Sequence, residues 1–189
     1  MAMPSPVTVP RYTIQDLESF PDDGNRYELL DGVLLVTPQP APSHQIVVAR
    51  LVKILSVYLE EAGRAEVVSP GGVEVEPNVH LEPDLLVVPV EALRPALVGE
   101  GRWTSIKQWW LAVEVSGPES RIYDRDHKRP AYLSLGVREV WRIDLREKRA
   151  YVSRAGEVGE TQVDDRLTWL PPGMAEPLVI EVPRLFALP

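Results

Sequence analysis

The sequence contains no cysteine, which excludes thiolate zinc sites, iron–sulfur clusters and a cysteine nucleophile. The same absence is compatible with a reducing cytoplasm. Long apolar runs are also missing, since no stretch approaches the roughly 18 residues that a membrane span needs. Residues 1–10 lack the charged start and apolar core of a secretion signal. We therefore expect a cytoplasmic protein that has no membrane partner.

Several common catalytic motifs are missing as well. The chain has neither G-x-x-x-x-G-K-[ST] nor G-x-G-x-x-G, so no nucleotide cofactor is expected. It also lacks the G-x-S-x-G turn of serine hydrolases. The histidines, His44, His80 and His127, are scattered without the spacing of metal ligands. These absences disfavour nucleotide-dependent, serine-hydrolase and histidine-zinc chemistry.

Basic residues are fewer than acidic residues. The 189 residues carry 28 acidic and 20 basic side chains, for a formal net charge of −8. This balance argues against non-specific coating of nucleic acid, which normally uses a broad basic face. It does not exclude a nuclease, because metal-binding carboxylates are themselves acidic. The hydrophobic fraction of 44% and the absence of a linker or repeat predict one globular domain over residues 1–189, with a core over about 13–154 and an extension over 155–189.

The order of strand patterns predicts a domain of mixed α/β class. Asp31-Gly32 joins two short apolar runs, which is a strong hairpin signal near the N-terminus. A second hairpin is expected around residues 144–148. The nearly unbroken apolar run over residues 109–115 is typical of a central strand covered on both faces. The predicted strands are residues 26–30, 33–36, 65–68, 73–75, 80–88, 109–115, 137–143 and 149–153.

Three helices are predicted from their starts and their apolar spacing, and a further short helix is expected over residues 91–97. Thr13 opens a pattern that resembles a capping box, with Asp in place of Glu, before a short helix. Ser43 is the expected N-cap of a longer helix, whose apolar residues recur at spacings of three and four. Asp124 or Asp126 is the expected N-cap of a helix that reaches about Leu135.

Two carboxylates stand within apolar runs. Asp84 and Glu114 are 30 positions apart, which is enough for one crossover between neighbouring strands. A carboxylate in a strand rich in valine and leucine is costly unless something pairs with it. A hydrated divalent cation is one such partner, and phosphate chemistry is its commonest use. A structural ion pair with lysine or arginine is the alternative for Glu114. A metal-dependent nuclease is the leading hypothesis.

Six segments occur in the order found in one known family. They resemble a bacterial restriction-endonuclease-like family, a domain of unknown function within the PD-(D/E)XK nuclease superfamily. The resemblance runs from about Thr13 to Arg154. It implies a restriction-endonuclease-like core, with a central mixed β-sheet flanked by helices and with N-terminal and C-terminal hairpins. The segments are Tyr27-Glu28-Leu29-Leu30-Asp31-Gly32, Ser43-His44, Glu82-Pro83-Asp84, Val113-Glu114-Val115-Ser116, Asp124-Arg125-Asp126-His127-Lys128, and Tyr132 to Asp144 with Gly136-Val137 and Trp141.

The resemblance implies an endonuclease that hydrolyses DNA phosphodiester bonds with Mg²⁺ or Mn²⁺. Asp84 and Glu114 match the acidic residues of the motif and would hold the metal with the backbone carbonyl of Val115. The lysine of the motif would fall at position 116, where this chain has Ser116. The family typically supplies a lysine from the following helix, and Lys128 matches that place. Lys128 would orient or deprotonate the attacking water, or offset charge in the transition state.

Two further residues are candidate substrate contacts. The family pattern places Glu28 near the site, as a further ligand or a carboxylate that positions water. His44 lies in the first turn of the predicted helix, where N–H groups attract anions such as phosphate. Each has a simpler interpretation. Glu28 alternates with apolar residues in a strand and can point to water, and a histidine at a helix start is commonly a cap-like or surface residue.

The charged segment after Glu114 also has two interpretations. Arg121, Arg125 and Arg129 recur every four residues and are a candidate basic stripe for substrate, with a solvated helix face as the default. Lys128 follows Asp124 by four residues, which is the spacing of an ordinary surface ion pair on a helix. Catalysis and surface pairing therefore both remain open for Lys128.

Two other functions remain open for the whole protein. One is a nuclease-fold module that has lost catalysis and binds nucleic acid or a protein partner, which the net charge and the displaced lysine both support. The other is an oligomeric scaffold whose apolar edges mediate self-association. A dimer or larger homo-oligomer is also compatible with a nuclease, because two sites can cut two strands. DNA is the expected partner in the leading hypothesis.

Overall fold

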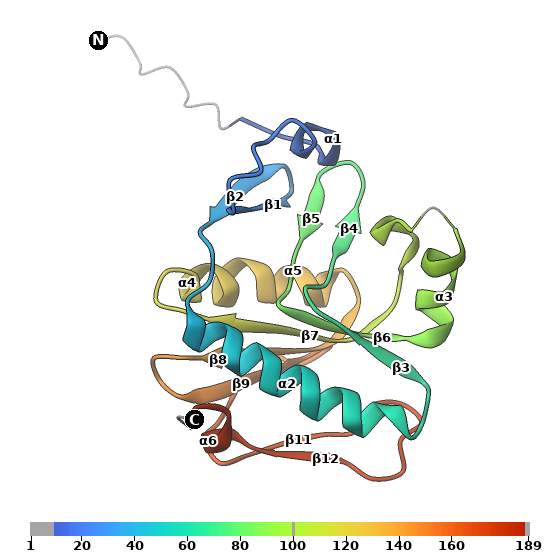
Figure 1. Cartoon of the computed structure of the whole chain (residues 1–189), viewed down its shortest axis with the longest axis vertical. Helices are drawn as coiled ribbons and strands as arrows, with labels where there is room; N and C mark the ends of the chain where they lie inside the picture. Colours follow the sequence, from blue (N-terminus) through green and yellow to red (C-terminus); the bar gives the residue numbers. More distant parts are fainter. Residues whose placement is uncertain (1–9, 100, 188–189) are drawn as a thin grey trace.

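The computed structural model describes residues 10–99 and 101–187. Three sheets and their flanking helices make up this part of the chain (Figure 1). In chain order the elements are α1 (Ile14–Leu17), β1 (Arg26–Leu30), β2 (Val33–Thr37), α2 (Pro42–Glu60), β3 (Ala65–Val68), β4 (Val73–Val75), β5 (Val79–Leu81), β6 (Leu85–Pro89), α3 (Val90–Val98), the 3₁₀ turn η1 (Trp103–Ser105), β7 (Trp109–Ser116), α4 (Arg121–Tyr123), the π-helical turn η2 (Asp124–Lys128), α5 (Arg129–Ser134), β8 (Val137–Asp144), β9 (Arg149–Arg154), β10 (Thr161–Val163), β11 (Arg166–Trp169), β12 (Leu178–Glu181) and α6 (Val182–Leu185).

The largest sheet has six strands in the order β10-β9-β8-β7-β6-β3. Strands β7 and β8 are parallel, and the other neighbouring pairs are antiparallel. The connection from β7 to β8 runs through α4, η2 and α5, as a parallel pair requires. All residues of β7 are buried, as predicted for a central strand. The mixed sheet with flanking helices confirms the predicted fold class.

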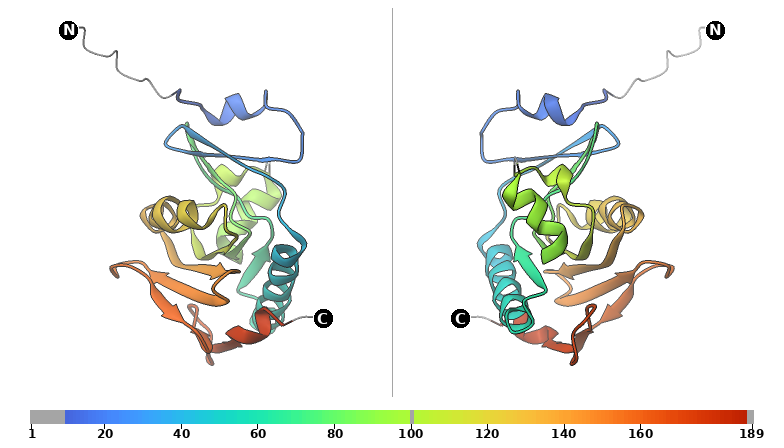
Figure 2. Two further views of the ribbon diagram at one scale, coloured as in Figure 1. Left: turned by 90° about the vertical axis from the view of Figure 1, so that its left-hand side faces the viewer. Right: turned by 90° about the vertical axis from the view of Figure 1, so that its right-hand side faces the viewer.

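Helices cover both faces of this sheet (Figure 2). Leu85 and Val87 of β6 join the buried cluster that contains α2, whereas Leu86 and Val88 join the cluster that contains α3 and α5. This alternation is the two-residue period of a strand. On β7, Ala112 belongs to the α5 cluster, and Glu114 follows it by two residues. The side chain of Glu114 is therefore directed to the face that α5 covers.

The smaller sheet has the order β2-β1-β5-β4 and stands at one end of the molecule in Figure 1. Its β1–β2 hairpin confirms the predicted turn at Asp31-Gly32, where both residues have positive φ angles, of 50° and 77°. A Cβ atom at Gly32 would also lie 3.0 Å from the carbonyl oxygen of Tyr12. Glycine is needed at this position for both reasons. The hairpin carries Arg26 and Glu28 towards the larger sheet.

The strand predicted over residues 80–88 is wrong, because the structure has two strands there. β5 ends at Leu81 in the smaller sheet, and β6 begins at Leu85 in the larger sheet. Pro83 lies between them and has no N–H to donate to a ladder, so neither sheet continues through it. The break places Asp84 where the two sheets meet, with only 5% of its surface exposed.

The first two helices differ in how well their starts were predicted. The capping box at Thr13 is confirmed at the start of α1. The N-cap of α2 is Ala41 and not Ser43, because the helix already begins at Pro42. The fixed φ angle of proline suits the first helical position, where its missing N–H has no partner to lose. Ser43 and His44 therefore lie inside the first turn of α2.

The helical crossover also begins earlier than predicted. It starts at Arg121, and neither Asp124 nor Asp126 caps it. The N–H of Asp124 donates to the carbonyl of Ser120, so the helix is already formed at this residue. The π turn then follows, in which the N–H of Arg129 donates five residues back to Asp124. The crossover ends at Ser134, close to the predicted end.

The C-terminal segment extends the same core. β10 joins the edge of the larger sheet, and β11, β12 and α6 pack beside α2. Leu167, Trp169, Ile180 and Leu185 belong to the buried cluster that contains Leu51 of α2. Among residues 10–99 and 101–187, no helix is long and apolar enough to span a membrane.

We expect Leu51→Ala to lower the free energy of unfolding by about 3 kcal/mol, since it removes a large side chain from the centre of the α2 cluster. Leu51 has no exposed surface, whereas Ile46 on the same helix is 40% exposed. Ile46→Ala is the matched control and should cost less than about 1 kcal/mol. Urea unfolding of both variants measures the difference. Equal losses would contradict the assigned packing of α2.

Candidate active site

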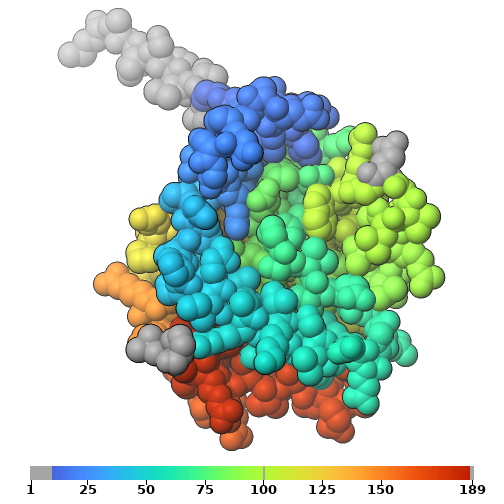
Figure 3. Space-filling model, viewed as in Figure 1, coloured from blue at the N-terminus to red at the C-terminus, as the bar shows by residue number. Residues whose placement is uncertain are grey.

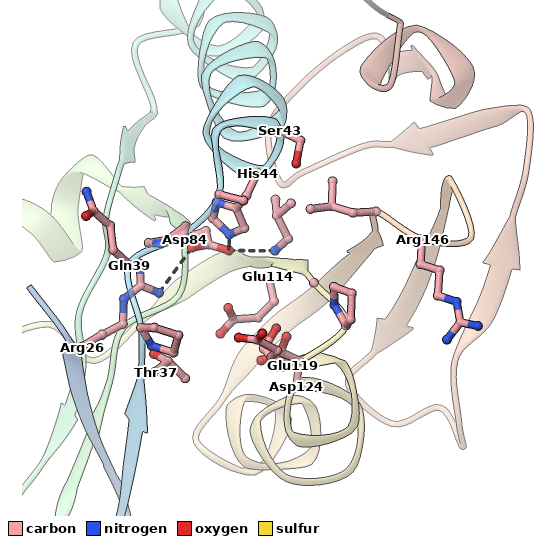
Figure 4. Close-up of a pocket in the computed structure, with 18 of the residues that line it drawn as sticks. Arg26, Thr37, Gln39, Ser43, His44, Asp84, Glu114, Glu119, Asp124 and Arg146 are labelled. Atoms are coloured by element: carbon pink, nitrogen blue, oxygen red, sulfur yellow. Dashed lines mark hydrogen bonds and ion pairs between the residues drawn. The ribbon is translucent and has the colours of Figure 1, made fainter.

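A cavity of about 690 Å³ opens where the start of α2, the end of β7 and the β5–β6 break meet. Figure 4 shows side chains from these elements directed towards it. Five residues that the sequence singled out line this cavity: His44, Asp84, Glu114, Val115 and Lys128. They come from four separate segments, so only the tertiary fold brings them together.

The pairing of β6 with β7 brings the two acids together. Leu85 lies opposite Val113 in this antiparallel pair, so Asp84, one residue before Leu85, lies beside the end of β7. The backbone N–H of Val115 donates to Asp84 Oδ2 at 2.8 Å. The intervening residues form α3 and η1. The strands β6 and β7 are neighbours, as predicted, but Asp84 itself lies in the break just before β6 and only Glu114 lies on a strand.

Both carboxylate oxygens of Asp84 have polar partners. Oδ2 lies 2.9 Å from His44 Nε2, and Oδ1 lies 3.3 Å from Arg26 Nη1 (Figure 4). Burial raises the pKa of Asp84, but the hydrogen bonds from His44 and Val115 and the charge of Arg26 outweigh burial and lower the pKa. Asp84 is therefore a charged carboxylate at neutral pH.

Glu114 is held by α5 and by the turn before it. Its Oε1 accepts hydrogen bonds from the Tyr132 hydroxyl at 2.6 Å and from Lys128 Nζ at 3.2 Å. Burial raises the pKa of Glu114 well above its usual value, against the charge of Lys128 and with the help of neighbouring acids. Burial likewise raises the pKa of Tyr132 well above its usual value, so its hydroxyl stays a donor. Lys128 is therefore the cation that the ion-pair interpretation of Glu114 requires.

Lys128 lies between two acids and is only 3% exposed. Its Nζ is 2.7 Å from Glu28 Oε1 and 3.2 Å from Glu114 Oε1. Burial lowers the pKa of Lys128, but the charges of Glu114, Glu28 and Asp124 outweigh burial and raise it. Lys128 is therefore an ammonium with these neighbours, which argues against a role as the base that deprotonates water. The predicted surface pair with Asp124 is wrong, because Lys128 is buried.

Glu28 lies behind Lys128 and does not line the cavity. Its side chain has no exposed surface, and its Oε1 also accepts the backbone N–H of Glu82 at 2.7 Å. Among the described residues, its Oε2 has no hydrogen-bond partner. This position gives no access to a substrate. Glu28 instead anchors Lys128, so the hypothesis of a direct substrate contact loses its support.

Arg121 and Arg125 do not line the cavity either. Arg121 Nη1 pairs with Glu147 at 2.8 Å, and Arg125 pairs with Asp126 at 2.8 Å. Arg129 donates to the backbone carbonyl of Arg125. The predicted basic stripe is therefore not available as a set of unpaired cations. The π turn also changes the angular spacing on which the four-residue repeat depended.

Among the charged residues of the cavity, Arg26, Asp124 and Arg146 were missed from the sequence, and Arg146 carried no signal beyond its place in the turn after residue 144. Asp124 is 4% exposed and accepts the Ser116 hydroxyl at 2.8 Å, and burial raises its pKa. Asp124 belongs to the charged segment that matches the family, and this match could have identified it as a site residue, although it was interpreted only as a helix cap. Arg26 precedes Glu28 by two residues on β1, so both side chains lie on the same face of the strand. This two-residue period could have predicted that Arg26 lies near the site.

The donor atoms of the cavity suit a hard divalent cation. Asp84, Glu114 and Asp124 all line it and offer oxygen atoms. In the described ranges, no three His, Cys, Asp or Glu side chains are grouped so as to hold a metal ion. Magnesium does not need such a cage, since it keeps several waters and binds through one or two carboxylates. The pair Asp84 and Glu114 is therefore compatible with a hydrated divalent cation of this kind.

Comparison with known proteins gives two matches. A sequence model of the Uma2 family, with the description "Putative restriction endonuclease", matches residues 14–182. The structure is similar to that of a protein from Anabaena variabilis described as "a putative nuclease belonging to DUF820", with a TM-score of 0.75. The two chains are 17% identical, and the similarity covers 92% of this chain and 97% of the other, which establishes the shared fold. No curated protein matches the chain.

We expect the stability of the Glu114→Gln variant, relative to that of the wild type, to increase as pH rises. The raised pKa means that the native state holds this proton more tightly than the unfolded state, so the wild type loses stability as pH rises above about 4.5 towards the raised pKa. Glutamine removes this loss. Urea unfolding at pH 5 and pH 8 should show the variant gaining at least about 1 kcal/mol on the wild type over this interval.

The matched control for this measurement is Glu119→Gln, since Glu119 is an exposed acid of the same cavity. Its stability relative to the wild type should change little between the two pH values. A constant difference for Glu114→Gln would contradict the raised pKa of Glu114.

Proposed function

This chain belongs to the Uma2 family, described as "Putative restriction endonuclease", and we propose that it is a divalent-metal-dependent endonuclease that hydrolyses DNA phosphodiester bonds. One observation carries the proposal. Asp84, just before β6, and Glu114, on the adjacent β7, line one cavity, with the ammonium of Lys128 3.2 Å from Glu114. Two acids and one lysine beside a cavity are the groups that hydrolysis of a phosphodiester needs.

We assign the metal to Asp84 and Glu114, together with the backbone carbonyl of Val115. Either Mg²⁺ or Mn²⁺ would suit these oxygen ligands. When bound, such a cation activates a water molecule as nucleophile and offsets charge on the phosphoryl group. The cluster of acids supports this assignment, because Asp84, Glu114 and Asp124 repel one another and a cation relieves that repulsion.

The neighbouring side chains hold the two acids in place. Tyr132 and Lys128 fix Glu114, and His44 fixes Asp84 from the first turn of α2. Loss of a group that orients a metal ligand in this way typically lowers metal affinity or activity by about 10- to 100-fold. Lys128 also places a positive charge beside the cavity, where it offsets the charge that develops on a phosphoryl group in the transition state.

We assign the contact with substrate phosphate to Arg146 rather than to Arg121 and Arg125. The role of His44 is to hold Asp84, because its Nε2 lies 2.9 Å from Asp84 and its Nδ1 is buried. Arg146 lines the cavity, is exposed, and forms no ion pair with any described residue. In Figure 4 it lies on the side of the cavity away from Arg26. An unpaired guanidinium at a cavity rim suits a phosphate, which it can bind with two parallel hydrogen bonds.

A nuclease-fold module without catalysis is the second candidate. The observation in its favour is that both oxygens of Asp84 and Oε1 of Glu114 already have partners within the protein. The negative charge of such a site is balanced by protein groups without a metal. Metal binding separates the two candidates, because only the nuclease needs Asp84 and Glu114 to accept a cation.

We expect Mg²⁺ or Mn²⁺ to support cleavage of a panel of double-stranded, single-stranded and branched DNA, and Glu114→Ala to abolish it. A lost metal ligand should lower the rate by at least about a hundredfold. Glu119→Gln is the matched control, because it removes an acid from the same cavity that has no role in the proposed mechanism. Gel electrophoresis of labelled products measures the rates.

Thermal denaturation with and without Mg²⁺ provides an independent readout of the metal. Wild type should melt at a higher temperature with Mg²⁺, and Asp84→Ala should abolish that rise. Absence of both cleavage and metal stabilisation in wild type would overturn the nuclease proposal in favour of the binding module.

A further inference from the structure

A second hollow, of about 780 Å³, lies between α2 and the C-terminal elements. It is bordered by the face of α2 from Arg50 to Tyr58, by β12 and by α6, and we call it the α2–β12 groove. Figures 1 and 2 show α2 and α6 side by side, and in Figure 3 the C-terminal elements lie directly below α2. Hydrogen bonds from Tyr58 to the Glu176 carbonyl, at 2.7 Å, and from Arg50 to the Leu185 carbonyl, at 2.8 Å, join the two walls.

The walls of the groove are basic, although the protein has a net charge of −8. Arg50, Lys53, Arg166 and Arg184 line it, against the single acid Glu181. Lys53 and Arg166 are exposed, and neither forms an ion pair with any residue in 10–99 or 101–187. This local charge favours an anionic ligand.

Apolar side chains lie between these cations. Val57 is 65% exposed and Val179 is 50% exposed, and Ile54 and Tyr58 also line the groove. A small inorganic anion would leave this apolar surface uncovered. A single strand of nucleic acid matches both features, because its phosphates bind cations while its bases cover apolar and aromatic side chains.

The groove begins on the helix that also borders the candidate active site. Ser43 and His44 line the active-site cavity, and Arg50 follows His44 by six residues on α2. At the rise of an α-helix this separation is about 9 Å. A strand whose phosphate lies in the cavity has this short distance to cover along α2, and it passes around the helix to Lys53, which projects about 180° from His44.

We propose that the α2–β12 groove binds a single strand of nucleic acid that extends from the candidate active site. Its phosphates lie against Lys53 and Arg166, and its bases lie over Val57 and Val179. The identity of the ligand rests on the proposed function, since a nuclease has such a strand at its active site.

Binding of a fluorescein-labelled 20-nucleotide oligothymidylate, measured by fluorescence anisotropy in EDTA, tests this proposal. The double variant Lys53→Gln, Arg166→Gln should raise Kd about tenfold at 100 mM salt. It should also reduce the slope of log K against log salt concentration by about 1.4, which corresponds to two lost phosphate contacts. The matched control is Arg94→Gln, Lys107→Gln, which removes the same charge from exposed residues outside the groove. It should leave Kd within about twofold of wild type.

Four results would overturn the proposal. In the first, the wild type does not bind the oligothymidylate, and in the second, the wild type and the groove variant bind it equally well. In the third, the groove and control variants lose the same affinity. In the fourth, the groove variant loses as much affinity for a DNA duplex of the same length as for the single strand. A change of oligomeric state in light scattering, without a change in Kd, would make the groove a surface for a second copy of the chain. The assay contains no metal and detects no cleavage, so failure of the nuclease proposal and failure of the groove are distinguishable.

Discussion

The buried ammonium of Lys128 joins three parts of the chain at one point. Glu28 comes from the smaller sheet, Glu114 from the centre of the larger sheet, and Lys128 from the helical crossover between β7 and β8. Loss of one partner from such a buried group typically costs about 3 to 5 kcal/mol, because an uncompensated charge stays behind. The position of the smaller sheet, the path of the crossover and the orientation of Glu114 are therefore coupled through Lys128. Tyr132 on Glu114 and Arg26 on Asp84 support the same arrangement.

The same arrangement explains why the acids of the cavity suit a cation. Asp84 has its partners in His44 and Arg26, and it stays charged. Glu114 and Asp124 have raised pKa values, because burial and their mutual charge are only partly offset by Lys128. A hydrated divalent ion would replace protons at this cluster and add the charge that one lysine cannot supply. The acidic cavity and the basic α2–β12 groove would then serve different parts of one substrate, the first at the scissile phosphate and the second along the strand.

Local sequence signals predicted the elements where the cause is local. The β1–β2 hairpin follows from Asp31-Gly32, the start of α1 follows from Thr13, and β7 follows from its unbroken apolar run. The failures are also instructive. The apolar pattern over residues 80–88 predicted one continuous strand, although Pro83 separates β5 from β6. The helix cap proposed at Asp124 overlooked the turn that begins at Arg121, since both patterns have the charged residues that favour helix starts.

The order of motifs along the chain was enough to identify the family, and the apolar runs around the two acids predicted the neighbouring strands β6 and β7. The ion pairs between particular cations and acids follow from the tertiary structure and could not be predicted from the sequence. The tertiary structure turned Glu28 inward as the anchor of Lys128, moved Arg121 and Arg125 away from the cavity, and brought Arg26 and Arg146 to it. The physical reason is that ion pairs form between residues far apart in the chain, and spacing along one helix or strand says nothing about the element packed against it. The α2–β12 groove has the same origin, since α2 and β12 become neighbours only when the core closes.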